Sequence, residues 1–176
     1  MLNTDYKIEA IKELLNEDCI LTRYYPLIPY KDILVDNLYK MKCYTKLDCM
    51  GLSEESLLEA GLTDIGMVKL FKAFLALYDI NPTKLREISS ICKTPEETQT
   101  FRELYQLPGV KSTRAMLYYK AGFRSLDDIA ISSPQEIIAK IENIIREENL
   151  SLKAPLMKEV KTHIAVARAF TDVLIE

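Results

Sequence analysis

This chain of 176 residues contains no tryptophan, one histidine and four cysteines, and these shortages exclude several kinds of site. The cysteines form no Cys-x-x-Cys pair, and His163 is far from all of them in the sequence; they are Cys19, Cys43, Cys49 and Cys92. A structural zinc site needs clustered Cys and His ligands, so we expect no metal ion. Scattered cysteines without a secretory signal are typically reduced, buried and inert, and we expect the same here.

Long apolar runs and catalytic motifs are missing as well. No stretch approaches the 18 or so apolar residues of a membrane span, and the charged, amphipathic segment 1–12 has no apolar signal core. The chain has no Ser-His-Asp arrangement, no Gly-rich phosphate loop and no metal-carboxylate motif. We therefore predict a non-enzymatic, cytoplasmic protein of bacterial type, with no catalytic residues, no cofactor and no membrane partner.

Charge is unevenly distributed along the chain. The net charge of −3 and the pI near 5.4 argue against a general polyanion binder, for which a pI above about 9 is usual. Residues 1–80 carry 9 basic and 13 acidic side chains, whereas residues 81–176 carry 14 and 13. Any nucleic-acid-binding face is therefore a local patch in the second half.

Helical signals dominate, and strand-like alternation is nearly absent, so the sequence predicts an all-α fold. Two prolines in the segment 24–29 prevent a helix there. The predicted helices cover about residues 4–15, 30–41, 53–60, 64–78, 82–91, 95–106, 112–121, 134–148 and 155–174, with a short helix opened by Ser125.

Several helix ends are marked by specific residues. Thr4 and Asn81 are candidate N-caps, and the segments 94–97 and 133–136 each have the capping-box pattern with a proline inside it. Gly61 and Gly122 are expected to end helices in the left-handed conformation. We predict a compact fold with an N-terminal half at residues 1–92 and a C-terminal half at residues 93–176.

A faint internal repeat is present. Residues 60–65 are similar to residues 121–126, at a separation of 61, and residues 64–69 can be aligned with residues 109–114. The two alignments differ in register, so a duplication is a hypothesis at this point.

The run 107–114, Leu-Pro-Gly-Val-Lys-Ser-Thr-Arg, predicts a tight turn between two helices. A helix N-terminus binds anions readily, because its first N–H groups lack partners and the helix dipole is positive there. From residue 105 to residue 126 the chain has no acidic residue and four basic ones, which are Lys111, Arg114, Lys120 and Arg124. The pattern indicates phosphate binding. Its alternative is a purely structural turn with Val110 in the core and a solvated basic face.

The turn 107–110, the helix end at 119–123 and the segment 125–130 together resemble the helix-hairpin-helix superfamily. The chain is similar to tandem, degenerate members found in uncharacterised bacterial proteins, and the match covers about residues 101–141. The resemblance implies two helix-hairpin-helix-like units plus a long C-terminal helix. It also implies non-sequence-specific binding of the DNA backbone through hairpin amides and nearby basic side chains; the residues implied are Gly109, Val110, Lys111, Ser112, Arg114, Lys120 and Arg124.

The chain departs from the family pattern in both copies. Lys111 stands where the family has a second hairpin glycine, and in the earlier copy Asp64 stands at the first glycine position, with Gly66 at the second. Sterile-alpha-motif domains, which are built similarly, use such helices to contact proteins. The alternative function is therefore a protein-interaction or self-associating scaffold module with structural hairpins.

The arrangement of the basic side chains distinguishes these hypotheses. Nucleic-acid binding requires Lys111, Arg114, Lys120 and Arg124 to converge on one exposed face, whereas pairing with acidic side chains favours the alternative. Tyr118 and Tyr119 could stack on bases, but adjacent helical residues point about 100° apart, so we expect them mainly in the core or at its boundary. A lone His163 without a ligand cluster is expected to be structural.

Overall fold

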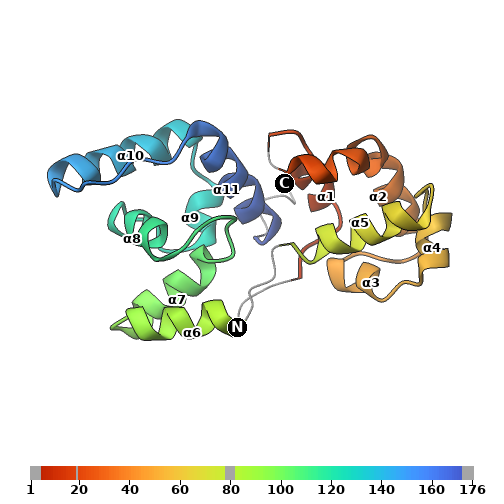
Figure 1. The fold of residues 1–176 in the computed structure, drawn as a ribbon, viewed down its shortest axis with the longest axis horizontal. Coiled ribbons are helices and arrows are strands. Elements are labelled where there is room, and N and C mark those ends of the chain that lie inside the picture. The colour runs from red at the N-terminus through yellow and green to blue at the C-terminus, as the bar shows by residue number, and fades with distance from the viewer. Residues whose placement is uncertain (1–4, 19, 78–81, 172–176) are drawn as a thin grey trace. The chain divides into compact units, whose positions relative to one another are not determined.

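The computed structural model describes residues 5–18, 20–77 and 82–171 (Figure 1). These residues contain helices and no named strand, which confirms the all-α prediction. Within the same ranges, none of the helices has the length and the apolar character needed to cross a membrane. Some predicted features lie outside the described residues, namely the caps at Thr4 and Asn81, the side chain of Cys19, and the helix ends at Tyr78 and Leu174.

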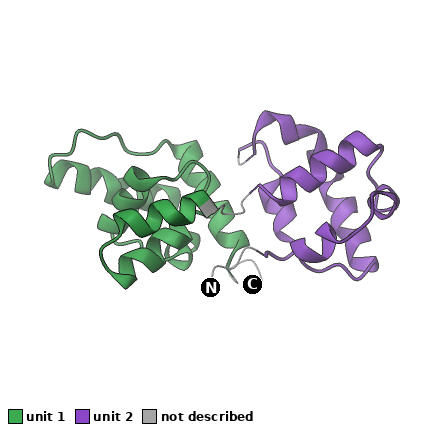
Figure 2. Ribbon diagram, turned by 60° about the horizontal axis from the view of Figure 1, so that its bottom comes forward, with its two compact units in different colours: residues 1–4, 78–176 green, residues 5–77 purple. Residues whose placement is uncertain are grey.

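The chain forms two compact units (Figure 2). We refer to residues 5–77 as the N-terminal unit and to the described residues from 82 to 171 as the C-terminal unit. The helix at 82–91 packs against the helix at 95–104, so by its contacts it belongs to the C-terminal unit. The predicted division of the chain into halves at residues 1–92 and 93–176 stays a prediction.

The N-terminal unit surrounds a core formed largely by the helix at 65–75. Phe71 and Phe74 are fully buried on this helix, and the Phe74 ring contacts the Tyr24 ring edge-on. The elements of the unit are α1 (Ala10–Leu14), the 3₁₀ helix η1 (Thr22–Tyr30), α2 (Lys31–Lys40), α3 (Lys46–Met50), α4 (Glu54–Glu59) and α5 (Ile65–Leu75).

The C-terminal unit is organised around its last helix, against which α9 and α10 pack. Val160 and Val166 on this helix are fully buried, as are Ile129 and Ile137 on the two helices that contact it. The elements are α6 (Pro82–Ile91), α7 (Pro95–Leu104), α8 (Ser112–Lys120), α9 (Leu126–Ala130), α10 (Pro134–Glu147) and α11 (Met157–Ala169).

The helix signals found in the sequence correspond to real caps. The side chains of Thr94, Ser125 and Ser133 each accept a hydrogen bond from the backbone N–H three residues later. Gly61 and Gly122 have φ angles of 120° and 99°, in the region that favours glycine. Side-chain caps therefore mark the starts of α7, α9 and α10, and glycines follow the ends of α4 and α8.

Three elements of the N-terminal unit differ from the prediction. The first helix, expected over about residues 4–15, covers only Ala10–Leu14 (α1), and residues 5–9 are not helical. The proline-containing segment, expected to be non-helical, forms the 3₁₀ helix η1, whose short i→i+3 turns tolerate Pro26 and Pro29. The helix α3 was not predicted. It begins with a full capping box, in which Thr45 accepts from the Asp48 N–H and the Asp48 carboxylate accepts from the Thr45 N–H.

The two units repeat the same local structure at a separation of 80 residues. The N-caps Thr45 and Ser125 each precede a helix of 5 residues, α3 and α9, in which the third residue is an aspartate that accepts a backbone hydrogen bond. The next N-caps, Ser53 and Ser133, follow at the same separation. Three consecutive features therefore share one register.

This register corrects both alignments suggested by the sequence. At a separation of 61, α5 with its 11 residues would be paired with α9 and its 5. At a separation of 80, residues 107–111 before α8 correspond to residues 27–31, which are the end of η1 and the first residue of α2, and not to the segment around Asp64. Asp64 is the N-cap of α5, where its carboxylate accepts from the Met67 N–H. The alignment at a separation of 61 was misleading because it paired Gly61 with Gly122, and both residues are glycine only because each follows the end of a helix.

Candidate interaction site

The turn between α7 and α8 presents its glycine to solvent and buries the residues around it. Leu107 and Val110 are buried, whereas Gly109 and Lys111 are exposed. Gly109 has a φ of 74°, and a Cβ placed there would meet nothing within 4 Å, so the glycine is required by its backbone angle alone. The Val110 N–H donates to the Leu107 carbonyl at 3.2 Å, which closes the turn. The structure therefore places Val110 in the core.

Helix α8 begins without a side-chain cap. Its N-cap is Lys111 in an extended conformation, and the first turn contains no acidic residue. Ser112 is half-buried, and its hydroxyl lies in hydrogen-bond contact with the Tyr105 hydroxyl. Burial, with Glu87 nearby, raises the pKa of Tyr105 to about 12. The first N–H groups of this 9-residue helix thus retain the positive end of the helix dipole.

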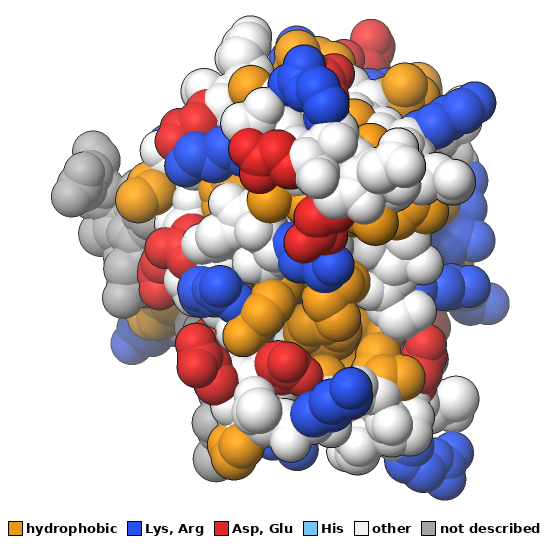
Figure 3. Space-filling view, turned by 90° about the vertical axis from the view of Figure 1, so that its left-hand side faces the viewer, with side chains coloured by type: hydrophobic (Ala, Val, Ile, Leu, Met, Phe, Trp, Pro, Cys, Tyr) orange, Lys and Arg blue, Asp and Glu red, His pale blue; other side chains and the backbone are white. Residues whose placement is uncertain are grey.

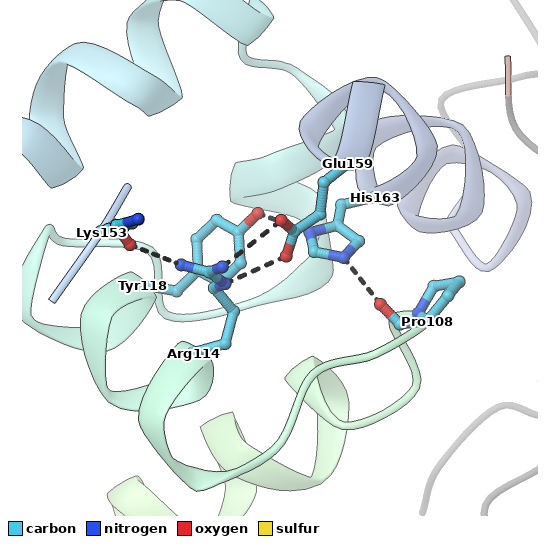
Figure 4. Close-up of polar contacts among 6 residues, drawn as sticks. All are labelled: Pro108, Arg114, Tyr118, Lys153, Glu159 and His163. Atoms are coloured by element: carbon cyan, nitrogen blue, oxygen red, sulfur yellow. Dashed lines mark hydrogen bonds and ion pairs between the residues drawn. The ribbon is translucent and has the colours of Figure 1, made fainter. Parts of the chain in front are cut away.

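His163 holds this turn against α11 from the inside (Figure 4). Its Nε2 lies 2.8 Å from the Pro108 carbonyl oxygen, and its Nδ1 lies 2.6 Å from the Tyr118 hydroxyl. A carbonyl only accepts, so Nε2 carries the proton and donates to Pro108. In the neutral ring Nδ1 then accepts from the Tyr118 hydroxyl. The histidine is thus part of a buried, fully paired network, which explains the residue as structural.

Burial determines the charge state of this network. Desolvation lowers the pKa of His163 below its ordinary value, although the hydrogen bond to Pro108 and the carboxylate of Glu159 oppose that shift. Desolvation also raises the pKa of the Tyr118 phenol, with Glu159 adding to the shift. Both rings are therefore neutral at pH 7, as the hydrogen-bond pattern requires.

Arg114 joins α8 to α11 and to the loop between α10 and α11 (Figure 4). Its Nε lies 3.0 Å from Glu159 Oε1, and its guanidinium also donates to Glu159 Oε2 at 3.4 Å. The same side chain donates to the Lys153 carbonyl at 3.1 Å. The side chains of Arg114 and Glu159 are only 24% and 30% exposed. We call this arrangement the Arg114 clasp.

The other three basic side chains have different environments. Lys120 Nζ lies 2.6 Å from Glu148 Oε2, and the Arg124 guanidinium lies 3.7 Å from the centre of the Tyr119 ring. Among the described residues, the Lys111 side chain has no hydrogen-bond or ion-pair partner, and it is exposed. The basic residues therefore have separate partners, and Lys111 alone keeps an uncompensated charge at the turn.

A groove runs along one face of α8. It has a volume of about 300 Å³. Its helix side presents residues spaced for a single face, and its other wall comes from the loop after α10. The lining residues are Ser112, Thr113, Met116, Leu117, Lys120, Leu150 and Leu152.

Hydrogen bonds at both ends of the loop after α10 hold the second wall of the groove in place. Asn149, with a φ of 50°, ends α10, and the Leu150 N–H returns to the Ile145 carbonyl at 2.9 Å. At the far side of the loop wall, the Arg114 clasp fixes the Lys153 carbonyl. Leu152 remains 40% exposed between these two anchors. The apolar surface is thus preformed, because both ends of its loop wall are hydrogen-bonded.

Sequence patterns identified the α8 side of this site but not its opposite wall. Ser112 and Lys120, predicted as phosphate-binding residues, line the groove, whereas Leu150 and Leu152 carried no signal of their own. Figure 3 shows a face of the C-terminal unit on which basic, acidic and hydrophobic side chains are interspersed. On that face no continuous basic surface surrounds the exposed apolar groups.

The three cysteines within the described residues are all free. Cys43 and Cys49 are free and buried next to each other, and burial raises the pKa of Cys43 and raises that of Cys49 to about 12. Cys92 is free and half-buried. Within the described ranges, no three His, Cys, Asp or Glu side chains gather in a way that could hold a metal ion.

Comparison with known families identifies the second half of the chain. Residues 77–170, more than half of the chain, match the family described as Domain of unknown function (DUF4332). The chain therefore belongs to this family. No curated protein and no solved structure matched this chain.

Proposed function

We propose that this member of the family is a protein-interaction module and that the groove beside α8 is its docking surface. The observation that carries the proposal is a preformed, largely apolar groove of about 300 Å³ with solvent-exposed leucine on its rim. Apolar grooves of this kind bind segments of partner proteins, because each apolar side chain that leaves water contributes to affinity.

The pairing of the basic side chains supports the same proposal. A phosphate-binding surface would leave its cations free for the ligand, but Arg114 and Lys120 have carboxylate partners and Arg124 lies on an aromatic ring. Arg114 holds the loop wall of the groove through Lys153. These residues therefore stabilise the unit around the groove.

A peptide-display selection on the purified full-length chain tests this function. We expect selected peptides to share a motif with two or more aliphatic residues and to lose binding to the variant Met116→Glu, which places a charge in the groove. Ile131→Glu is the matched control, because Ile131 is an exposed apolar residue of the same unit outside the groove. A selection without a shared motif, or one equally affected by both variants, would contradict the proposal.

A second candidate is non-specific binding of the DNA backbone at the turn. It is favoured by the uncapped start of α8 beside the uncompensated Lys111, and by the resemblance to helix-hairpin-helix proteins. The groups available are the backbone amides near Gly109 and Ser112 and the ammonium of Lys111. With one free cation, we expect a log–log salt slope of roughly −1 to −2.

Duplex binding at about 50 mM salt tests the second candidate. We expect Lys111→Glu to abolish binding and Lys161→Glu, an exposed charge reversal on α11, to leave it intact. If the wild-type chain does not bind at tens of micromolar, or if both variants bind alike, the turn has no role in DNA binding.

A further inference from the structure

We infer that the occupant of the groove is a partner-protein segment that places two or three aliphatic side chains on the groove floor and a carboxylate at the N-terminal end of α8. This inference rests on the proposed docking function and adds to it the chemistry and the direction of the ligand.

The floor of the groove selects aliphatic groups. Met116, Leu117, Leu150 and Leu152 supply its apolar surface, and no aromatic ring is among the lining residues. Nucleobases need aromatic faces on which to stack, and the nearby Tyr119 ring is already covered by Arg124. A volume near the lower end of small-molecule pockets, which span about 300–1,000 Å³, suits a few side chains better than a large cofactor.

The two ends of the groove differ in charge, and this difference orients the ligand. At one end, Lys120 is neutralised by Glu148 at 2.6 Å. At the other end, Ser112 and Thr113 line the groove at the start of α8, where Lys111 is exposed, no side chain caps the helix and the first turn has no acidic residue. A carboxylate is therefore favoured at this end alone, by the free lysine charge together with the helix dipole.

A peptide that binds both the apolar floor and the start of α8 carries its acidic residue always before, or always after, its aliphatic residues in sequence. The loop wall stays in place for such a ligand because the Arg114 clasp holds the Lys153 carbonyl. Arg114 is thus a positioning residue, and Lys111 is the residue expected to contact the carboxylate.

The test is a display selection against the full-length chain with two peptide libraries, one carrying Asp or Glu beside a pair of leucines and one carrying Lys or Arg there. We expect wild-type protein to enrich the acidic library on one side of the leucine pair only. Against Lys111→Glu, the acidic preference should disappear, and the best acidic peptide should bind about tenfold more weakly. Lys161→Gln, an exposed change on α11 outside the groove lining, should leave the preference unchanged.

The outcomes separate this inference from the docking function itself. Enrichment of leucine pairs without any acidic preference, or an acidic preference that Lys111→Glu leaves intact, would overturn the inference while the docking function stands. No enrichment, or enrichment insensitive to Met116→Glu, would overturn both. Displacement of the acidic peptide by a short DNA duplex in wild type but not in Lys111→Glu would assign that end of the groove to phosphate and overturn the carboxylate assignment.

Discussion

The segments at the starts of α2 and α8 occupy equivalent positions in the two units, but their backbone donors and charged groups differ. At a separation of 80 residues, Pro29 corresponds to Gly109 and Asp32 corresponds to Ser112. Proline has no N–H to offer, and Asp32 places a negative charge in the first turn of α2. Lys31, the counterpart of Lys111, donates to the Leu15 carbonyl at 3.3 Å. At this position the N-terminal unit therefore lacks both the backbone N–H of Gly109 and an unpaired lysine.

The cores behind the two turns differ in a related way. The seventh residue of α5 is Phe71, the seventh residue of α11 is His163, and both are fully buried. His163 contacts Tyr118 of α8, and the counterpart of Tyr118 in the N-terminal unit is Leu38, which is also buried. Where the N-terminal unit has two buried apolar side chains, the C-terminal unit has a hydrogen-bonded pair, and the histidine of that pair also donates to the Pro108 carbonyl.

The largest expected effect comes from removing this polar anchor. His163→Ala leaves the Pro108 carbonyl and the Tyr118 hydroxyl without partners and creates a cavity, so we expect a loss of about 4 kcal/mol in the free energy of unfolding. Urea denaturation measures it, and Lys161→Ala, an exposed change on the same helix, should cost less than about 0.5 kcal/mol. A loss below about 1 kcal/mol for His163→Ala would show that the network does not hold the turn.

The same histidine should make stability depend on pH. Burial lowers the pKa of His163 in the folded state, so the unfolded chain takes up the proton first as the pH falls. The stabilisation is complete above about pH 6.5 and is lost as the pH falls towards the lowered pKa, by up to about 1.4 kcal/mol per pH unit. His163→Phe, which imitates Phe71, should remove this slope between about pH 7 and pH 5.

Asp48 acts in a different pH window and does not obscure this test. Backbone hydrogen bonds from Tyr44 and Thr45 lower the pKa of Asp48, so its contribution is lost only below about pH 3.8. If wild type and His163→Phe show the same slope between about pH 7 and pH 5, the buried ring does not control the acid sensitivity of the C-terminal unit.

The sequence predicts local features well, because caps and stops are encoded within three or four residues. Ser125, Ser133 and Gly122 behave as expected from their residue types. Helix α3 escaped prediction because it has only 5 residues, too few for a hydrophobic period, and because its Lys46 is buried.

The partners of the basic residues could not be predicted from local patterns. Glu148 lies 28 residues from Lys120, and Glu159 lies 45 residues from Arg114. Residues 105–126 contain no acidic residue, and this local pattern indicated a basic patch. In the folded unit, carboxylates from α11 and from the end of α10 pair with two of its basic side chains. The opposite wall of the groove escaped for the same reason, since Leu150 and Leu152 form a groove only when the loop returns beside α8.

A smaller effect is expected from replacing Arg114, which anchors the loop wall of the groove. Its counterpart in the N-terminal unit is Leu34, which is fully buried. Arg114→Leu removes a partly exposed ion pair, so we expect a change within about 1 kcal/mol in overall stability. Hydrogen exchange at residues 150–153 should nevertheless speed up, because the loop wall loses its anchor at the Lys153 carbonyl. Unchanged exchange there, with Lys158→Ala as the control, would show that the clasp does not fix the groove.

The smallest effects concern the residues that end α2 and α8. Lys42 has a φ of 61° where its counterpart Gly122 has a φ of 99°, so the N-terminal unit places a side chain in a conformation that glycine adopts freely. We expect Lys42→Gly to stabilise the protein by up to about 1 kcal/mol and Gly122→Ala to destabilise it by about 1 kcal/mol. Chemical denaturation of the two variants checks both signs.

The magnitude at Gly122 is informative because a Cβ there would meet nothing within 4 Å. Its cost therefore comes from the backbone angle alone, and the two substitutions should be nearly equal and opposite if the turns at 42 and 122 are equivalent. A loss well above about 2 kcal/mol for Gly122→Ala, or a destabilising effect of Lys42→Gly, would separate the two turns. The common register at 80 residues would then have to rest on the caps of α3, α9, α4 and α10 alone.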